Sequence, residues 1–147
     1  MIVFILAGIL LGSPSNDGIA DTNASAVYVS AVLTASPPSL KAGQPGELLL
    51  RFRPASGIHI AGEPAVTIHL DTTSVVVPGG PLTQETDSTS GSLRANVPVR
   101  LRVALRPGAE PGTYLSRATV SYFYCSDAEG WCRKKSDILP FTITISR

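Results

Sequence analysis

Residues 97–106 of this chain decide its fold class, and they read Val97-Pro98-Val99-Arg100-Leu101-Arg102-Val103-Ala104-Leu105-Arg106. Aliphatic residues occupy every second position, and three of the positions between them carry arginine. Side chains alternate between the two faces of a strand, so this pattern predicts a strand with one face in the core and the other in water. A sheet that is exposed on one face is typical of antiparallel pairing.

Short segments of the same kind lie on both sides of this strand, separated by turns rich in proline and glycine. We expect the further strands at residues 27–33, 47–53, 57–60, 66–70, 74–77, 113–124 and 139–145. Proline and glycine punctuate the chain at 78–81 and 107–112, and the polar residues 83–92 predict a long loop. Many short strands and no helical period predict an all-β, immunoglobulin-like antiparallel β-sandwich, with one domain spanning 27–147.

The composition excludes two broad classes of protein. The chain has 147 residues, a formal net charge of +1, 16% charged residues and 44% hydrophobic residues. A nucleic-acid-binding protein usually carries a strong basic excess, which is missing here, so we expect no nucleic-acid partner. The high hydrophobic content disfavours intrinsic disorder, and a chain of this length can bury a sizeable core.

The N-terminal residues 1–26 predict export from the cytoplasm. The run Ile2–Leu11 is almost wholly apolar but is about half the ~20 residues that a membrane-spanning helix needs. Small residues follow it, and cleavage after Ala20 or Ala26 fits a signal peptide. The first basic residue is Lys41, so the usual basic start is missing, and an uncleaved anchor or a buried strand are the alternatives. We expect an exported, periplasmic protein that contacts the membrane only through this segment.

The chain has two cysteines, Cys125 and Cys132, with six residues between them. Two cysteines are too few for a disulfide-rich scaffold or a four-ligand zinc site, and we expect no metal and no cofactor. The polar segment between them contains Gly130 and is short enough to turn back and allow a disulfide. Closing so small a loop stabilises a fold by roughly 2–3 kcal/mol. The pair is therefore either a modest structural bridge or a redox couple.

The residues around the two cysteines suggest how their chemistry could differ. Tyr122 and Tyr124 precede Cys125 in an aromatic strand, and Trp131 in the polar loop is expected to pack over the disulfide. Arg133, with Lys134 and Lys135, follows Cys132 directly. Positive charge favours a thiolate, whereas Asp127 and Glu129 oppose it near Cys125, so the more reactive thiolate is expected at Cys132.

The two histidines of the chain leave a further question open. His59 and His69 each lie in an expected strand, and each is either a base near the thiols or an ordinary surface residue of its strand.

The cysteine segment resembles the N-terminal periplasmic domain of the DsbD family of thiol:disulfide interchange proteins. The resemblance lies in an aromatic strand end followed by Cys125-Ser126-Asp127-Ala128-Glu129-Gly130-Trp131-Cys132 and then a closing strand. The run 97–107, the turn Pro111-Gly112-Thr113-Tyr114 and the segment Gly57-Ile58-His59-Ile60 are similar to the strands that lead to the cysteines in that family. The likeness covers about Val27 to Ile145, and the spacing of six residues is one longer than the family's usual five.

The resemblance implies an immunoglobulin-like sandwich whose cysteine pair passes electrons to oxidised thioredoxin-like proteins of the periplasm. A membrane-embedded cysteine pair, expected here to act in trans, would recharge it. Cys125 and Cys132 would carry the exchange, with Cys132 joined to the partner and Trp131, Tyr124, Tyr122 and Arg133 in support. The competing hypothesis is a non-catalytic exported β-sandwich that binds a partner and uses Cys125–Cys132 as a structural disulfide.

Overall fold

The computed structural model describes residues 27–147, so the predicted signal peptide or anchor at 1–26 lies outside the described residues. Within 27–147 the chain forms strands, turns and loops and contains no helix, hence none that could cross a membrane. The strands are β1 (Val29–Ser36), β2 (Ser39–Lys41), β3 (Gly46–Pro54), β4 (Ile58–Ile60), β5 (Thr67–Leu70), β6 (Val76–Thr83), β7 (Val99–Leu105), β8 (Gly112–Ser126) and β9 (Cys132–Ser146).

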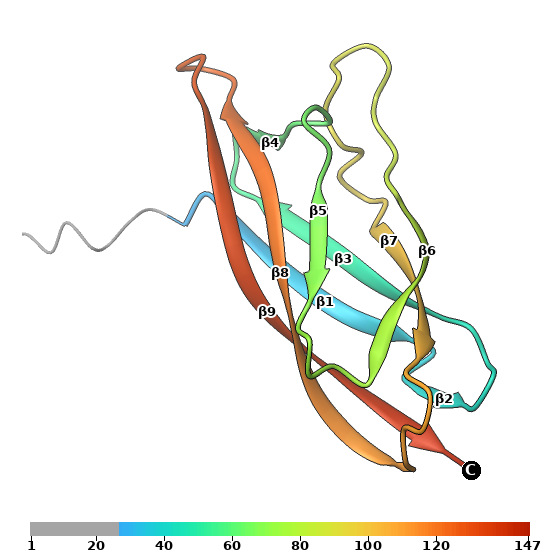
Figure 1. Cartoon of the computed structure of the whole chain (residues 1–147). Helices are drawn as coiled ribbons and strands as arrows, with labels where there is room; N and C mark the ends of the chain where they lie inside the picture. The colour runs from blue at the N-terminus through green and yellow to red at the C-terminus, as the bar shows by residue number, and fades with distance from the viewer. Residues whose placement is uncertain (1–26) are drawn as a thin grey trace, which may run out of the picture.

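The strands form two facing sheets (Figure 1). One sheet has the order β1-β3-β7-β6, and the other has the order β2-β9-β8-β4, with β5 also paired to β8. All pairs are antiparallel except the short pair of β2 and β9. In immunoglobulin domains the first, second, fifth and fourth strands share one sheet, and the third, sixth and seventh share the other. This chain has the same arrangement, with β4 and β5 together in the place of the third strand and β2 as an additional strand. The predicted immunoglobulin-like sandwich is therefore confirmed.

The core lies between the inner faces of the two sheets. Val99, Leu101 and Val103 of β7 are at most 5% exposed, while Arg100 and Arg102 between them face solvent, so the predicted alternation of residues 97–106 is confirmed. The opposite sheet contributes buried residues from its long hairpin, among them Val120 and Ile143. Burial of these apolar side chains is the main favourable contribution to folding.

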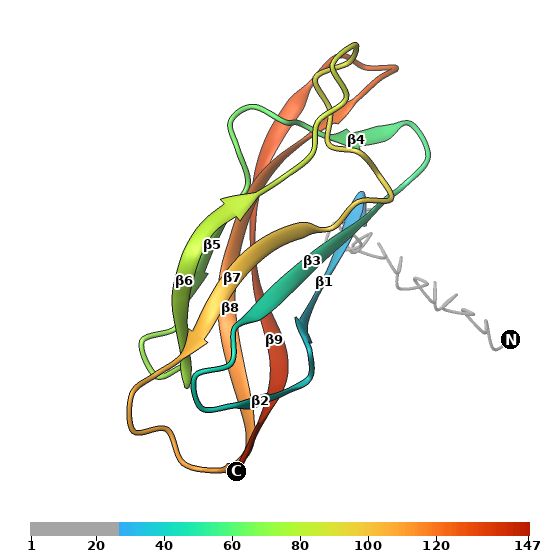
Figure 2. The ribbon, with the colours of Figure 1, turned by 90° about the vertical axis from the view of Figure 1, so that its right-hand side faces the viewer.

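The hairpin of β8 and β9 runs the length of the molecule, with its turn at one end and the C-terminus at the other (Figures 1 and 2). Its strands pair without a break from Gly112 opposite Ile145 to Cys125 opposite Cys132. The sequence predicted a strand only from residue 139, and this was wrong. The start of β9 contains polar residues such as Arg133 and Lys134 and so lacks the apolar alternation that predicts a strand. Its extended conformation is stabilised by pairing with β8.

Two other strand boundaries differ from expectation. The predicted turn at 78–81 is part of β6, whose register with β7 shifts between Pro78 and Leu82. Prolines, which cannot donate to a ladder, are accommodated because β6 is an edge strand and the irregularity removes the need for those bonds. The short strand β2 is absent from the predicted strands, and it buries Leu40 beside the end of β9.

We expect Leu50→Ala to lower the free energy of unfolding by about 2–5 kcal/mol, because Leu50 is 0% exposed and its loss leaves a cavity. Leu115→Ala is the matched control, since Leu115 is 68% exposed and its truncation should change stability by about 0.5 kcal/mol or less. Urea unfolding followed by fluorescence measures both. Equal destabilisation of the two variants would contradict the placement of the core.

Candidate functional site

Cys125 and Cys132 form a disulfide between the last residues of β8 and the first of β9, with an S–S distance of 2.02 Å. They lie directly opposite each other, and their Cα atoms are 4.0 Å apart. The next pair along the hairpin is hydrogen-bonded, because Ser126 N donates to Trp131 O at 2.9 Å. The cysteines therefore occupy a non-hydrogen-bonded position, where opposing side chains stand closest.

The turn beyond the disulfide is compact and brings the two strands into register. Gly130 has a φ of 70°, a left-handed conformation that glycine adopts without steric cost, and its N–H donates to Ser126 O at 3.0 Å. Glu129 N also donates to the Ser126 hydroxyl at 3.2 Å. The polar excursion predicted around Gly130 is thus a closed hairpin loop.

The two sulfur-bearing residues differ in exposure. Cys125 is 6% exposed, whereas Cys132 is exposed to solvent. The buried cysteine lies between two strands, with β9 on one side and β4 on the other. An incoming thiolate would therefore meet Cys132 first, and Cys125 would be the leaving group of such an attack.

Three aromatic rings cluster beside the hairpin tip. Trp131 meets Tyr28 and Tyr124 edge-on, with ring centroids 5.3 and 5.7 Å apart, and the two tyrosine rings are stacked at 5.8 Å. The guanidinium carbon of Arg133 lies 4.1 Å from the centroid of a Trp131 ring, a favourable cation–π contact. We call Tyr28, Tyr124, Trp131 and Arg133 the aromatic cluster; it ties the hairpin to the residue that precedes β1.

The aromatic cluster and the disulfide lie on opposite faces of the hairpin. Successive residues of a strand point to opposite faces, so Tyr124 points away from the side of Cys125, and Arg133 from that of Cys132. The prediction that Trp131 packs over the disulfide is therefore wrong, because its ring packs on the two tyrosines, on the face away from the sulfur atoms. Lys134, and not Arg133, shares the face of Cys132.

Tyr122 is a core residue that supports the hairpin from within. It is 1% exposed, its ring packs on Phe52 with centroids 4.7 Å apart, and its hydroxyl donates to Asp137 Oδ2 at 2.7 Å. Burial, and then the hydrogen bond to the Asp137 carboxylate, raise the pKa of Tyr122 well above its usual value. The phenol therefore stays protonated and acts as a fixed donor between β8 and β9.

Only one of the two histidines lies beside the cysteines. His59 of β4 is directly opposite Cys125 in the sheet, and its Nδ1 lies 2.5 Å from Asp127 Oδ1. His69 pairs with Thr119, farther along β8. No local signal in the sequence distinguishes them, because the position of His59 depends on the pairing of β4 with a strand late in the chain.

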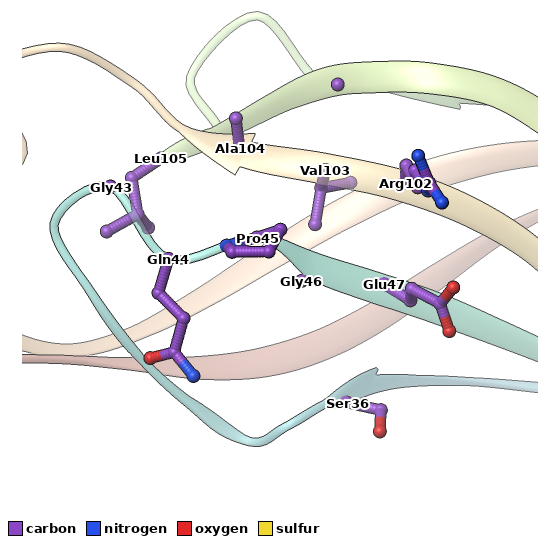
Figure 3. Close-up of a pocket in the computed structure, with 11 residues that line it drawn as sticks. Ser36, Gly43, Gln44, Pro45, Gly46, Glu47, Arg102, Val103, Ala104 and Leu105 are labelled. Carbon is purple, nitrogen blue, oxygen red and sulfur yellow. The ribbon is translucent and has the colours of Figure 1, made fainter.

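A separate hollow of about 630 Å³ lies near the opposite end of the sandwich, between the β2–β3 turn, β3 and β7 (Figure 3). Its lining combines glycine and proline with side chains such as Gln44, Glu47 and Arg102, and contains no cysteine or histidine. Among residues 27–147, no group of three or more His, Cys, Asp or Glu side chains is arranged to hold a metal ion. The hairpin tip is therefore the candidate site.

Comparison with known proteins supplies no functional assignment. No protein-family model and no curated protein matches the sequence. The solved structures that are similar include murine CRIg, which is 10% identical and has a TM-score of 0.41, with 80% of this chain and 99% of that chain covered. They also include the C-terminal domain of ZirS, which is 12% identical and has a TM-score of 0.41, with 99% of this chain and 88% of that chain covered.

We expect reduction of the disulfide to lower the free energy of unfolding by about 2–3 kcal/mol while the domain remains folded. The loop it closes is short, and the two strands are also held by continuous pairing from Gly112 to Cys125. Denaturant unfolding with and without a reductant measures the difference, and the Cys125→Ser/Cys132→Ser variant is the control for incomplete reduction. Loss of cooperative unfolding in the reduced protein would contradict this expectation.

Proposed function

We propose that this protein is a periplasmic thiol–disulfide exchange domain that passes reducing equivalents through Cys125 and Cys132 to thioredoxin-like proteins. The observation that carries the proposal is a disulfide at the tip of one hairpin, with one cysteine buried and the other exposed. The resemblance of the cysteine segment to the DsbD N-terminal domains points to the same chemistry. The apolar segment 2–11 supports export to a compartment where such chemistry operates.

The position of the disulfide favours exchange over stapling. It joins two neighbouring strands of one sheet, whereas the conserved bridge of antibody domains joins the two sheets across the core. The two strands are already hydrogen-bonded to each other along their length. The disulfide therefore adds little further restraint on their relative position. A bond with a small structural effect and an accessible sulfur atom is suited to repeated opening.

The proposed reaction begins with the reduced domain. The Cys132 thiolate attacks a sulfur of the partner's disulfide, forming a mixed disulfide and releasing the partner's second sulfur as a thiolate. The Cys125 thiolate then attacks the Cys132 sulfur, restores the Cys125–Cys132 bond and releases the partner as a dithiol. Two electrons pass to the partner, and a membrane-embedded dithiol acting in trans returns two electrons to the domain.

The charges at the tip support Cys132 as the attacking residue. Lys134 follows on the same face, and exposed positive charge favours the thiolate form. Asp127 is on the Cys125 side of the turn, where its carboxylate is already paired with His59.

The competing function is that of a non-catalytic exported binding module whose Cys125–Cys132 disulfide is purely structural. A formed disulfide in an immunoglobulin-like sandwich fits that function as well. The two functions differ in how readily the bond is reduced.

We expect the Cys125–Cys132 pair to have a reduction potential in the range of thioredoxin-like carriers, about −120 to −270 mV, because exchange needs a bond that partners can open. Equilibration of the domain with glutathione or dithiothreitol buffers, followed by thiol alkylation and mass measurement, gives the potential. A value below about −300 mV would support the structural disulfide and refute the exchange function.

We expect Cys125→Ala to accumulate a mixed disulfide through Cys132 with an oxidised thioredoxin-like protein of the periplasm, because nothing remains to resolve it. Cys132→Ala is the matched variant and should trap far less, since Cys125 is buried. Non-reducing electrophoresis and mass spectrometry identify the adduct. If neither single-cysteine variant captures such a protein, the exchange function is wrong.

A further inference from the structure

A histidine and a carboxylate lie beside the buried cysteine, and the proposed exchange as described so far uses neither. His59 in β4 is the cross-strand neighbour of Cys125 in β8. Residues directly opposite each other in a sheet share a face, with Cβ atoms about 4.5–5.5 Å apart. Because Cys132 is the neighbour of Cys125 on the other side, the three residues form a row across β4, β8 and β9.

Asp127 completes this arrangement from the same face. It lies two residues beyond Cys125, and its backbone N–H donates to Gly57 O at 2.9 Å, which places it opposite a residue with no side chain. Its carboxylate turns toward β4, and Oδ1 lies 2.5 Å from Nδ1 of His59. A carboxylate on Nδ1 selects the tautomer with the proton on that nitrogen and leaves the Nε2 lone pair free to accept a proton.

A second charged side chain, that of Arg94, lies on the other side of β4 from Asp127. It lines, together with His59, a small hollow of about 80 Å³ between β4 and the segment that leads to β7. Leu93 N donates to Ile60 O at 2.9 Å, so this segment is attached to the free side of β4. The His59 side chain is 35% exposed, which leaves it open to exchange protons with solvent.

We propose that His59, oriented by Asp127, is the acid–base residue for the Cys125 sulfur. This inference rests on the proposed exchange function. In the resolving step, Nε2 of His59 takes the proton of the Cys125 thiol, and the resulting thiolate attacks the Cys132 sulfur of the mixed disulfide. The Cys125–Cys132 bond forms, the bond from Cys132 to the partner breaks, and the partner sulfur leaves with the electron pair.

The same pair acts in the opposite direction when the domain is reduced. A donor thiolate attacks Cys132, and the electron pair of the broken disulfide goes to the Cys125 sulfur, which lies away from solvent. The His59 imidazolium gives its proton to this thiolate, producing a neutral thiol and a neutral imidazole. Asp127 is a positioning residue in both directions, since it fixes the ring and its tautomer without touching the sulfur.

The test follows the resolving step without any protein partner. Reduced domain is mixed with dipyridyl disulfide, whose thiopyridone product is coloured. Attack by Cys132 releases one thiopyridone, and attack by Cys125 on the resulting mixed disulfide releases the second. We expect His59→Asn to slow the second release about a hundredfold at neutral pH and to leave the first unchanged.

The pH profile and two further variants separate acid–base chemistry from a structural effect. At neutral pH the second release should be fast in the wild type and slow in His59→Asn, and the difference should shrink at alkaline pH, where a thiol ionises without a base. Asp127→Asn should slow the same step, and Asp127→Glu should recover part of it. His69→Asn is the matched control and should behave as the wild type, because His69 lies opposite Thr119.

Two outcomes would overturn the inference. One is a second release in His59→Asn with the rate and pH profile of the wild type. The other is an equal slowing of both releases together with a lower unfolding midpoint, as expected if His59 and Asp127 only hold the hairpin tip to β4. Failure of the exchange function is distinguishable, since it appears as a very negative potential or an absence of trapped partner, whatever His59 does to the second release.

Discussion

The uninterrupted pairing of β8 with β9 is the interaction on which the rest of the structure depends. Its register is fixed by the core, because alternate residues such as Val120 on β8 and Ile143 on β9 are buried between the sheets. A slip of one residue would turn each buried side chain toward solvent. The same register sets Cys125 opposite Cys132 at the far end of the hairpin, so the apolar core fixes the geometry of the disulfide at a distance.

The alternation along this hairpin also separates packing from chemistry. On one face the aromatic cluster attaches the tip to the chain entering β1, through Tyr28. On the other face lie the two cysteines, with His59 beside them. Because the rings and the sulfur atoms do not share a face, the ring contacts that hold the tip do not involve the disulfide. The proposed exchange function would require this separation, because its disulfide breaks at every turnover.

Local pattern predicted much of the fold and only part of the site. Residues 97–106 predict their strand because the polarity of each side chain indicates whether it faces the core or solvent. The same holds for the other alternating segments. The start of β9 escaped prediction because charged residues there are held by a neighbouring strand. The cysteine pair could be found from its spacing. The proximity of His59, and not His69, to Cys125 depends on which strand pairs with the end of β8, and no local sequence pattern predicts that pairing.

The strand that carries His59 has only three residues, and this gives the site a stability of its own. β4 is attached to β8 along Ile58–Ile60 and through backbone bonds of Gly57 and Ala61, and on its other side through Ile60 and Ala61, so it has a far shorter ladder than the one between β8 and β9. Short segments with few contacts detach at a lower free energy than the whole domain needs to unfold. Fraying of β4 would withdraw the imidazole and uncover Cys125 while the β8–β9 ladder stayed intact. Under the proposed exchange function, the domain would lose the acid–base residue of Cys125, and regain it, without passing through the unfolded state.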